Sequence, residues 1–177
     1  MVEVEVTVQD CFYKNFPLES VSCDTSNNLI TDENWEKWFQ RWVETLYTEL
    51  PAAKGYELSL RLTDDTEIQS LNAQYRQKNQ PTDVLAFAAL EVDYPQLPIE
   101  LLESMPLYLG DIVISVDTAQ RQAQQQGHSL TTELAWLAAH GLLHLIGWDH
   151  PDEPSLLRML NQQEKLLKAV GLNLPFL

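Results

Sequence analysis

The segment HGLLHLIGWDH, residues 140–150, contains three of the four histidines in the chain. His140 and His144 are four residues apart, so on a helix their side chains lie on the same face. Gly147 can end such a helix, because glycine readily adopts the left-handed conformation in which helices stop. The chain can then fold back and bring His150 to that face. The segment therefore predicts a helix that ends at Gly147, with three histidines gathered beside its end.

Three neutral imidazoles can bind one Zn²⁺ at about 2.0–2.1 Å each and leave the fourth tetrahedral position open for water. An open position is typical of a catalytic zinc, and such a metal activates water for hydrolysis near neutral pH. We therefore predict one Zn²⁺ per chain, bound by His140, His144 and His150, and a hydrolytic reaction. His128 lies outside the pattern and is not expected to be a ligand.

Zinc peptidases of the metzincin type share this histidine spacing and the glycine. Their signature places a glutamate, the general base, directly after the first histidine. In this chain that position is Gly141, which cannot transfer a proton. A zinc peptidase is therefore an alternative to the favoured interpretation developed below.

Outside this segment, apolar residues recur with the periods of strands and helices. Together the segments predict one α/β (α+β) layer domain over residues 1–177, with a mixed sheet of about four strands packed by helices. Residues 9–30 and 91–107 are predicted to be loops. Strands are predicted at 2–8, 55–63, 83–90 and 108–116, and helices at 32–50, 65–75, 117–126, 131–147 and 154–170.

The chain carries 11 basic and 26 acidic side chains, a net charge of −15. This balance argues against direct binding to nucleic acid or to an anionic membrane. A local basic surface is still possible if Arg61, Arg76, Lys78 and Arg121 gather on one face. The N-terminus lacks the features of a signal peptide, and no apolar run is long enough to span a membrane. We therefore expect a cytoplasmic protein with no membrane partner.

Two aspartates are candidates for supporting the metal site. Asp111 interrupts the apolar strand at 108–116, and burying a carboxylate is costly unless it is paired. Its partner could be the free N–H of a zinc-bound histidine or backbone amides near the start of the strand. Asp149 precedes His150 and could orient a ligand in the same way, or it could be a solvated loop residue.

Two more segments accompany the histidines: NAQYRQKNQPTDVLAF at 72–87 and LGDIVIS at 109–115. Together the three segments resemble the YbeY family of bacterial rRNA maturation endoribonucleases. The family patterns are HGxLHLxGxDH and NxxYRxxxxPTDVLxF, and Ala86 stands where many members have serine. The resemblance extends over about residues 55–170.

The resemblance implies a zinc-dependent, single-strand-specific endoribonuclease that matures the 3′ end of small-subunit (16S) rRNA and takes part in ribosome quality control. Arg76 matches the family's functionally important arginine, so it is the candidate catalytic residue, although the local sequence alone favours a surface ion pair. Thr82 and Asp83, in the PTD stretch, are candidates for the substrate side of the site or for supporting its ligands.

The partners implied are ribosomal RNA or the small ribosomal subunit. The acidic net charge suggests that a ribosome-associated protein or the ribosome itself helps to deliver the RNA. Two other interpretations stay open. One is a zinc hydrolase that acts on peptides or another small substrate, which Gly141 disfavours. The other is a non-enzymatic ribosome assembly factor with a structural zinc, which the open coordination position disfavours.

Overall fold

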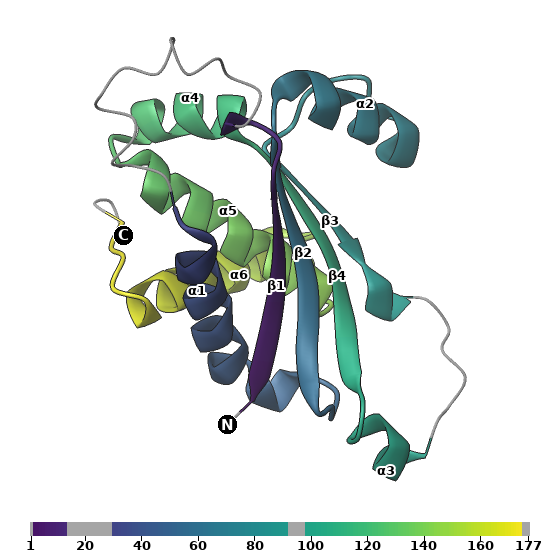
Figure 1. Cartoon of the computed structure of the whole chain (residues 1–177). Coiled ribbons are helices and arrows are strands. Elements are labelled where there is room, and N and C mark those ends of the chain that lie inside the picture. The colour runs from purple at the N-terminus through teal and green to yellow at the C-terminus, as the bar shows by residue number, and fades with distance from the viewer. Residues whose placement is uncertain (1, 14–29, 92–97, 175–177) are drawn as a thin grey trace.

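A four-stranded mixed sheet organises the computed structural model, which describes residues 2–13, 30–91 and 98–174 (Figure 1). Three strands are parallel, and β3 pairs antiparallel with β4 at one edge, in the order β1-β2-β4-β3. The predicted mixed sheet is therefore confirmed. Residues 14–29, most of the loop predicted at 9–30, lie outside the described residues. The strands are β1 (Glu3–Asp10), β2 (Gly55–Thr63), β3 (Val84–Ala88) and β4 (Pro106–Ser115).

The helices follow the predicted order, with differences at their ends. The third strand leads into a short helical turn, and another short helix interrupts the loop predicted at 91–107. No helix in the described part of the chain is long and apolar enough to cross a membrane. The helices are α1 (Asp32–Thr45), η3 (Tyr47–Glu49), α2 (Asp65–Arg76), η4 (Ala89–Glu91), α3 (Ile99–Leu102), α4 (Val116–Gln126), α5 (Leu130–Leu145) and α6 (Glu153–Ala169).

Successive side chains of a strand point to opposite faces of the sheet. Apolar residues at every second position therefore make one face of this sheet apolar. Leu58, Leu60 and Leu62 of β2 are buried on this face, together with Ile112 and Ile114 of β4. Helices α1 and α5 cover it and α6 packs against both of them, whereas α2 lies on the opposite side (Figure 1).

Helix α5 is buried along nearly its whole length, so the core fixes the position of any side chain that it carries. It begins at Leu130, where the Ser129 side chain accepts a hydrogen bond from the Thr132 N–H. The helix predicted at 131–147 therefore begins one residue earlier than expected. The periodicity of a helix buried on all sides gives little information about its ends, because apolar residues occur on every face.

Gly141 lies where α5 packs closely against Ile112 of β4. A Cβ atom placed there would be 2.8 Å from Cγ2 of Ile112. The position at which a metzincin carries its catalytic glutamate therefore faces the packed core in this protein. It offers no room for a carboxylate side chain.

We expect Gly141→Ala to destabilise the protein. Overpacking a core contact costs about 1–3 kcal/mol, which exceeds the gain of at most about 1 kcal/mol from replacing glycine by alanine in a helix. Denaturant unfolding of Gly141→Ala in the parent and in an Ile112→Ala background measures the effect. The cost should shrink in that background, where the clashing atoms are gone. Equal costs in both backgrounds would mean that Ile112 does not limit the space at Gly141.

Candidate metal centre

The three histidines predicted to form a site meet at the end of α5. Nε2 of His144 lies 3.0 Å from Nε2 of His140. The ring centroid of His150 is 5.6 Å from that of His140 and 5.5 Å from that of His144. One ligand atom from each residue can be chosen so that all three lie within 4.8 Å of one another. Tetrahedral coordination at zinc–nitrogen distances of 2.0–2.1 Å separates ligand atoms by about 3.3 Å. The cluster therefore fits a single metal ion.

The end of α5 brings His150 back to the other two histidines. The Trp148 N–H donates to the Leu143 carbonyl at 2.9 Å, and the Gly147 N–H donates to the His144 carbonyl at 3.1 Å. This pair of bonds is the Schellman arrangement, which needs a residue with positive φ after the helix. Gly147 supplies it with φ of +101°. The prediction that this glycine ends the helix is confirmed.

We expect Gly147→Ala to weaken metal binding and to cost about 1–3 kcal/mol of stability, the range for a strained backbone conformation. No atom lies within 4 Å of a Cβ at this position, so the effect would come from the backbone and not from a clash. Relief of the strain should move the turn and displace His150. A metal titration followed by calorimetry would measure this loss.

Gly171→Ala is the matched control. Gly171 follows α6 with φ of +81°, and no atom lies within 4 Å of a Cβ there. This variant should lose stability to a similar extent but keep the metal affinity of the parent. Equal metal affinity in both variants would show that Gly147 does not position His150.

Gln163 of α6, which is fully buried, orients the first histidine. Its Oε1 lies 3.0 Å from Nδ1 of His140, and its Nε2 donates to the Trp136 carbonyl at 3.3 Å. The glutamine oxygen therefore accepts from Nδ1–H, which leaves the Nε2 lone pair of His140 available to a metal. Gln163 was not among the residues predicted to form the site. Its signal is a glutamine on the buried face of an amphipathic helix, four residues after Met159.

Burial lowers the pKa of both histidines on α5. For His140, the proximity of His150 adds to the effect, while the hydrogen bond with Gln163 and the negative charge of Asp83 oppose it. For His144, both other histidines of the cluster lower the pKa further. Both imidazoles are therefore neutral at pH 7, the state in which a histidine can donate a lone pair to a metal.

The histidines line a cleft of about 960 Å³, which Arg76 and Lys78, at and just after the end of α2, also line. The Arg76 guanidinium is exposed and donates from Nη2 to the Ala86 carbonyl at 3.0 Å. Among the described ion pairs, none involves Arg76. Two segments far apart in the sequence, the one around Arg76 and the one around the histidines, therefore line a single cleft.

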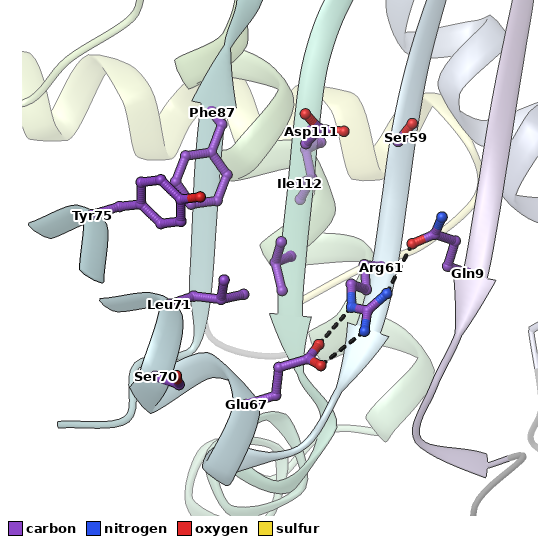
Figure 2. Close-up of a pocket in the computed structure, with 11 residues that line it drawn as sticks. Gln9, Ser59, Arg61, Glu67, Ser70, Leu71, Tyr75, Phe87, Asp111 and Ile112 are labelled. Atoms are coloured by element: carbon purple, nitrogen blue, oxygen red, sulfur yellow. Dashed lines mark hydrogen bonds and ion pairs between the residues drawn. The ribbon is translucent and has the colours of Figure 1, made fainter. Parts of the chain in front are cut away.

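Arg61 and Arg121 lie elsewhere, so the four basic residues Arg61, Arg76, Lys78 and Arg121 do not gather on one face. Arg61 pairs with Glu67 in a second pocket of about 620 Å³ on the α2 side of the sheet (Figure 2). Asp111 lines the same pocket, is exposed, and accepts a 2.6 Å hydrogen bond from the Tyr108 hydroxyl. The expectation that Asp111 is buried is therefore wrong, and its partner is a hydroxyl group, neither a histidine N–H nor the backbone amides that were the two candidates.

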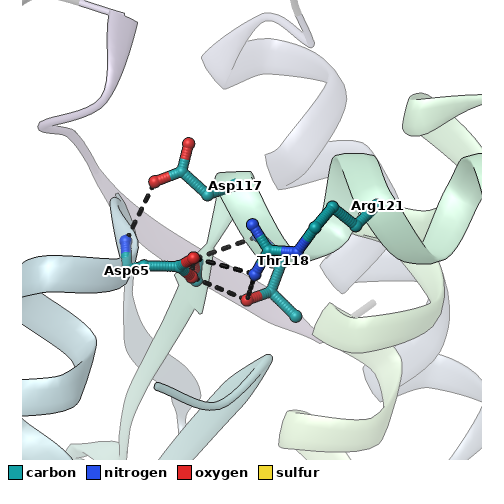
Figure 3. A network of polar contacts seen from close by, with 5 residues as sticks. Asp65, Asp117, Thr118 and Arg121 are labelled. Atoms are coloured by element: carbon teal, nitrogen blue, oxygen red, sulfur yellow. Dashed lines mark hydrogen bonds and ion pairs between the residues drawn. The ribbon is translucent and has the colours of Figure 1, made fainter. Parts of the chain in front are cut away.

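Arg121 belongs to a network that joins the start of α2 to α4 (Figure 3). The Asp65 carboxylate accepts from the Ser115 and Thr118 hydroxyls at 2.6 Å each, and from Arg121 at 2.8 Å. The Asp117 carboxylate accepts from the Asp65 N–H at 3.0 Å. This network fixes the start of the helix whose last residue is Arg76.

Thr82, Asp83 and Asp149 also line the cleft. Asp83 accepts from the Val84 N–H at 2.7 Å and from the Gln122 side chain at 3.2 Å. Asp149 accepts from the His150 N–H at 2.8 Å. Among the hydrogen bonds of the described residues, none joins these three to an imidazole. Asp83 and Asp149 thus fix local backbone beside the histidines.

His128 lies apart from the cluster. Its Nε2 contacts the Glu133 carboxylate, and both side chains are largely buried. Burial raises the pKa of Glu133, while the contact with His128 opposes the rise. The fourth histidine is therefore engaged in a separate contact, as its place outside the sequence pattern suggested.

Comparison with known proteins yields one family. The family model described as Endoribonuclease YbeY matches residues 20–171. A Nostoc sp. protein named Endoribonuclease YbeY is 62% identical over 174 residues, which cover 98% of this chain and 94% of that protein. The protein of the same name from Trichormus variabilis is also 62% identical and covers 98% of both chains. The solution structure of TM1509 from Thermotoga maritima shares the fold, with a TM-score of 0.51 and 21% identity, covering 94% of this chain and 88% of that one.

Proposed function

Because this chain belongs to the YbeY family of endoribonucleases, we propose that it is a zinc-dependent enzyme that cleaves single-stranded RNA in the histidine cleft. The observation that carries the proposal is that three histidines close enough to hold one metal ion and an exposed arginine line the same cleft. A phosphodiester hydrolase needs both an activated nucleophile and a cation for the phosphate. The proposed ligands are His140, His144 and His150, and the proposed catalytic residue is Arg76.

The chain's own residues have distinct tasks in this proposal. A bound zinc ion supplies Lewis acidity that activates water near neutral pH. Gln163 keeps the lone pair of His140 directed at the cluster. Arg76 donates its remaining N–H groups to the phosphoryl oxygens, where negative charge grows in the transition state. Lys78 adds positive charge on the same wall of the cleft.

The proposed biological substrate is the 3′ end of 16S rRNA in the small ribosomal subunit, with a further role in ribosome quality control. The resemblance of the three sequence segments to the family supports this proposal. The net charge of −15 supports a role for a ribosome-associated protein, because an acidic protein captures free RNA poorly. The cleft would then act on an RNA end that the ribosome and this partner hold in place.

Cleavage assays with three substrates test the proposed substrate class. Zinc-loaded protein is incubated with single-stranded RNA, with an RNA duplex and with casein, and His144→Ala is the control. We expect cleavage of the single strand alone, and no cleavage by the control. Casein cleavage without RNA cleavage would favour the peptidase instead. In a second assay, zinc-loaded protein is incubated with immature small ribosomal subunits. We expect the 3′ end of their 16S rRNA to become shorter.

A further inference from the structure

The floor of the cleft is the outer edge of β3. Within the described residues, this strand pairs only with β4, so its other edge has no strand beside it. All five residues of β3 line the cleft that holds the histidines and Arg76. Backbone groups on that edge are therefore available to a bound substrate.

The direction of each backbone group follows from two contacts. A Cβ built on Gly110 of β4 would lie 2.2 Å from the Phe87 carbonyl oxygen, so that carbonyl points toward β4. Backbone groups of neighbouring strand residues point to opposite sides. The N–H and carbonyl of Ala86 therefore point away from β4, toward the cleft. The hydrogen bond from Arg76 to the Ala86 carbonyl agrees with this direction.

Because Arg76 donates to a carbonyl on this edge, the edge offers a ligand more hydrogen-bond donors than acceptors. A peptide that adds to an edge strand uses both the N–H and the carbonyl of the same residue. At Ala86 the carbonyl is occupied by the guanidinium, whereas the N–H beside it still faces the cleft. An anion needs donors only, and a guanidinium has five N–H groups, most of which remain for a second partner.

We propose that the Ala86 N–H and the Arg76 guanidinium together form a subsite for one phosphate group of the RNA strand. The inference rests on the proposed function and adds a main-chain donor to it. The strand fixes this N–H before substrate arrives, so the donor needs no reorganisation when the phosphate binds. The same arrangement favours an anion over an extended peptide, because a peptide N–H would have to share the Ala86 carbonyl with the guanidinium.

The test removes this one hydrogen. Replacing Ala86 by lactic acid turns the amide into an ester, so the side chain stays and the N–H is lost. We expect binding of a short single-stranded RNA and kcat/KM to fall about tenfold or more, the effect of one hydrogen bond to a charged group. Zinc content and melting temperature should stay near those of the parent.

The matched control is the same change at Val6 on the opposite edge of the sheet. The Val4 N–H donates to Gln40 and not to β2, so alternate residues of β1, including Val6, present their N–H groups to the outer edge. The ester at Val6 should bind and cleave RNA as the parent does. Equal losses at both positions would overturn the subsite, because they would reflect a general effect of the ester.

A second measurement uses the unmodified chain. The ¹⁵N-labelled amide of Ala86 should shift when short single-stranded RNA is added to metal-free protein, and the Val6 amide should not. An unmoved Ala86 amide, or parental binding by the ester at Ala86, would overturn the subsite while RNA cleavage by the parent still upheld the proposed function. A parent that neither binds nor cleaves RNA would overturn both.

Discussion

Replacing any one of His140, His144 and His150 by alanine is expected to remove most of the bound zinc and nearly all RNA cleavage. Two imidazoles hold the metal far less tightly than three. Loss of a catalytic metal forfeits several kcal/mol of transition-state stabilisation, which corresponds to a fall in rate of about a thousandfold or more. Elemental analysis and cleavage rates on the same preparations measure both effects.

His128→Ala is the control for this series, because it removes an imidazole outside the cluster. This variant loses the contact between His128 and Glu133, which should lower the stability of the fold. It should still bind one zinc per chain. Undiminished zinc in all three cluster variants would exclude the site. Loss of zinc in His128→Ala alone would place the metal elsewhere in the chain.

Arg76→Ala is expected to lower RNA cleavage by about a hundredfold or more, the usual loss for one transition-state donor. Zinc content should not change. The melting temperature should fall by only a few degrees, because Arg76 is exposed and its described contact with the fold is a single hydrogen bond to Ala86. Arg76→Lys should recover only part of the activity, since an ammonium group cannot bind two phosphate oxygens in the planar fork of arginine.

Arg61→Ala is the matched arginine variant, since Arg61 pairs with Glu67 in the second pocket and not in the cleft. It should cleave RNA at nearly the parental rate. Parental activity in Arg76→Ala would remove Arg76 from catalysis, and unfolding of that variant would make it a structural residue. Lys78, on the same wall, would then be the next cation to test.

The sequence predicted the local features of the site well, because spacing and chain breakers determine them. Two histidines four apart share a helix face in any context, and Gly147 provides the one conformation that lets His150 return. The order of strands and helices likewise followed from hydrophobic period. Such features depend on neighbours along the chain, which the sequence lists directly.

Asp111 illustrates where the period of a strand misleads. Simple alternation would place it on the same face as Leu109, which is buried. The register between β2 and β4 shifts at Glu57 and Leu58, where β4 has an extra residue, and Gly110 takes φ of +138° there. This bulge turns Asp111 to the outer face and Ile112 to the core. A glycine inside an apolar strand was the available signal for it.

The partners of the long polar side chains could not be predicted from the sequence. Arg61, Arg76 and Arg121 look alike in a list of residues, yet their partners are Glu67, a backbone carbonyl and Asp65. Gln163 reaches His140 only because α6 packs against α5. Such contacts depend on how elements distant in sequence are packed, and no local pattern reports them.

The central claim is that a metal held by the three histidines enables RNA cleavage, and a zinc titration tests it most directly. Metal-free protein is titrated with zinc, and the cleavage rate of single-stranded RNA is measured at each step. We predict no cleavage without metal, a linear rise, and a plateau at one zinc per chain. Full cleavage by the metal-free protein, or a rate that does not change with bound zinc, would contradict the account.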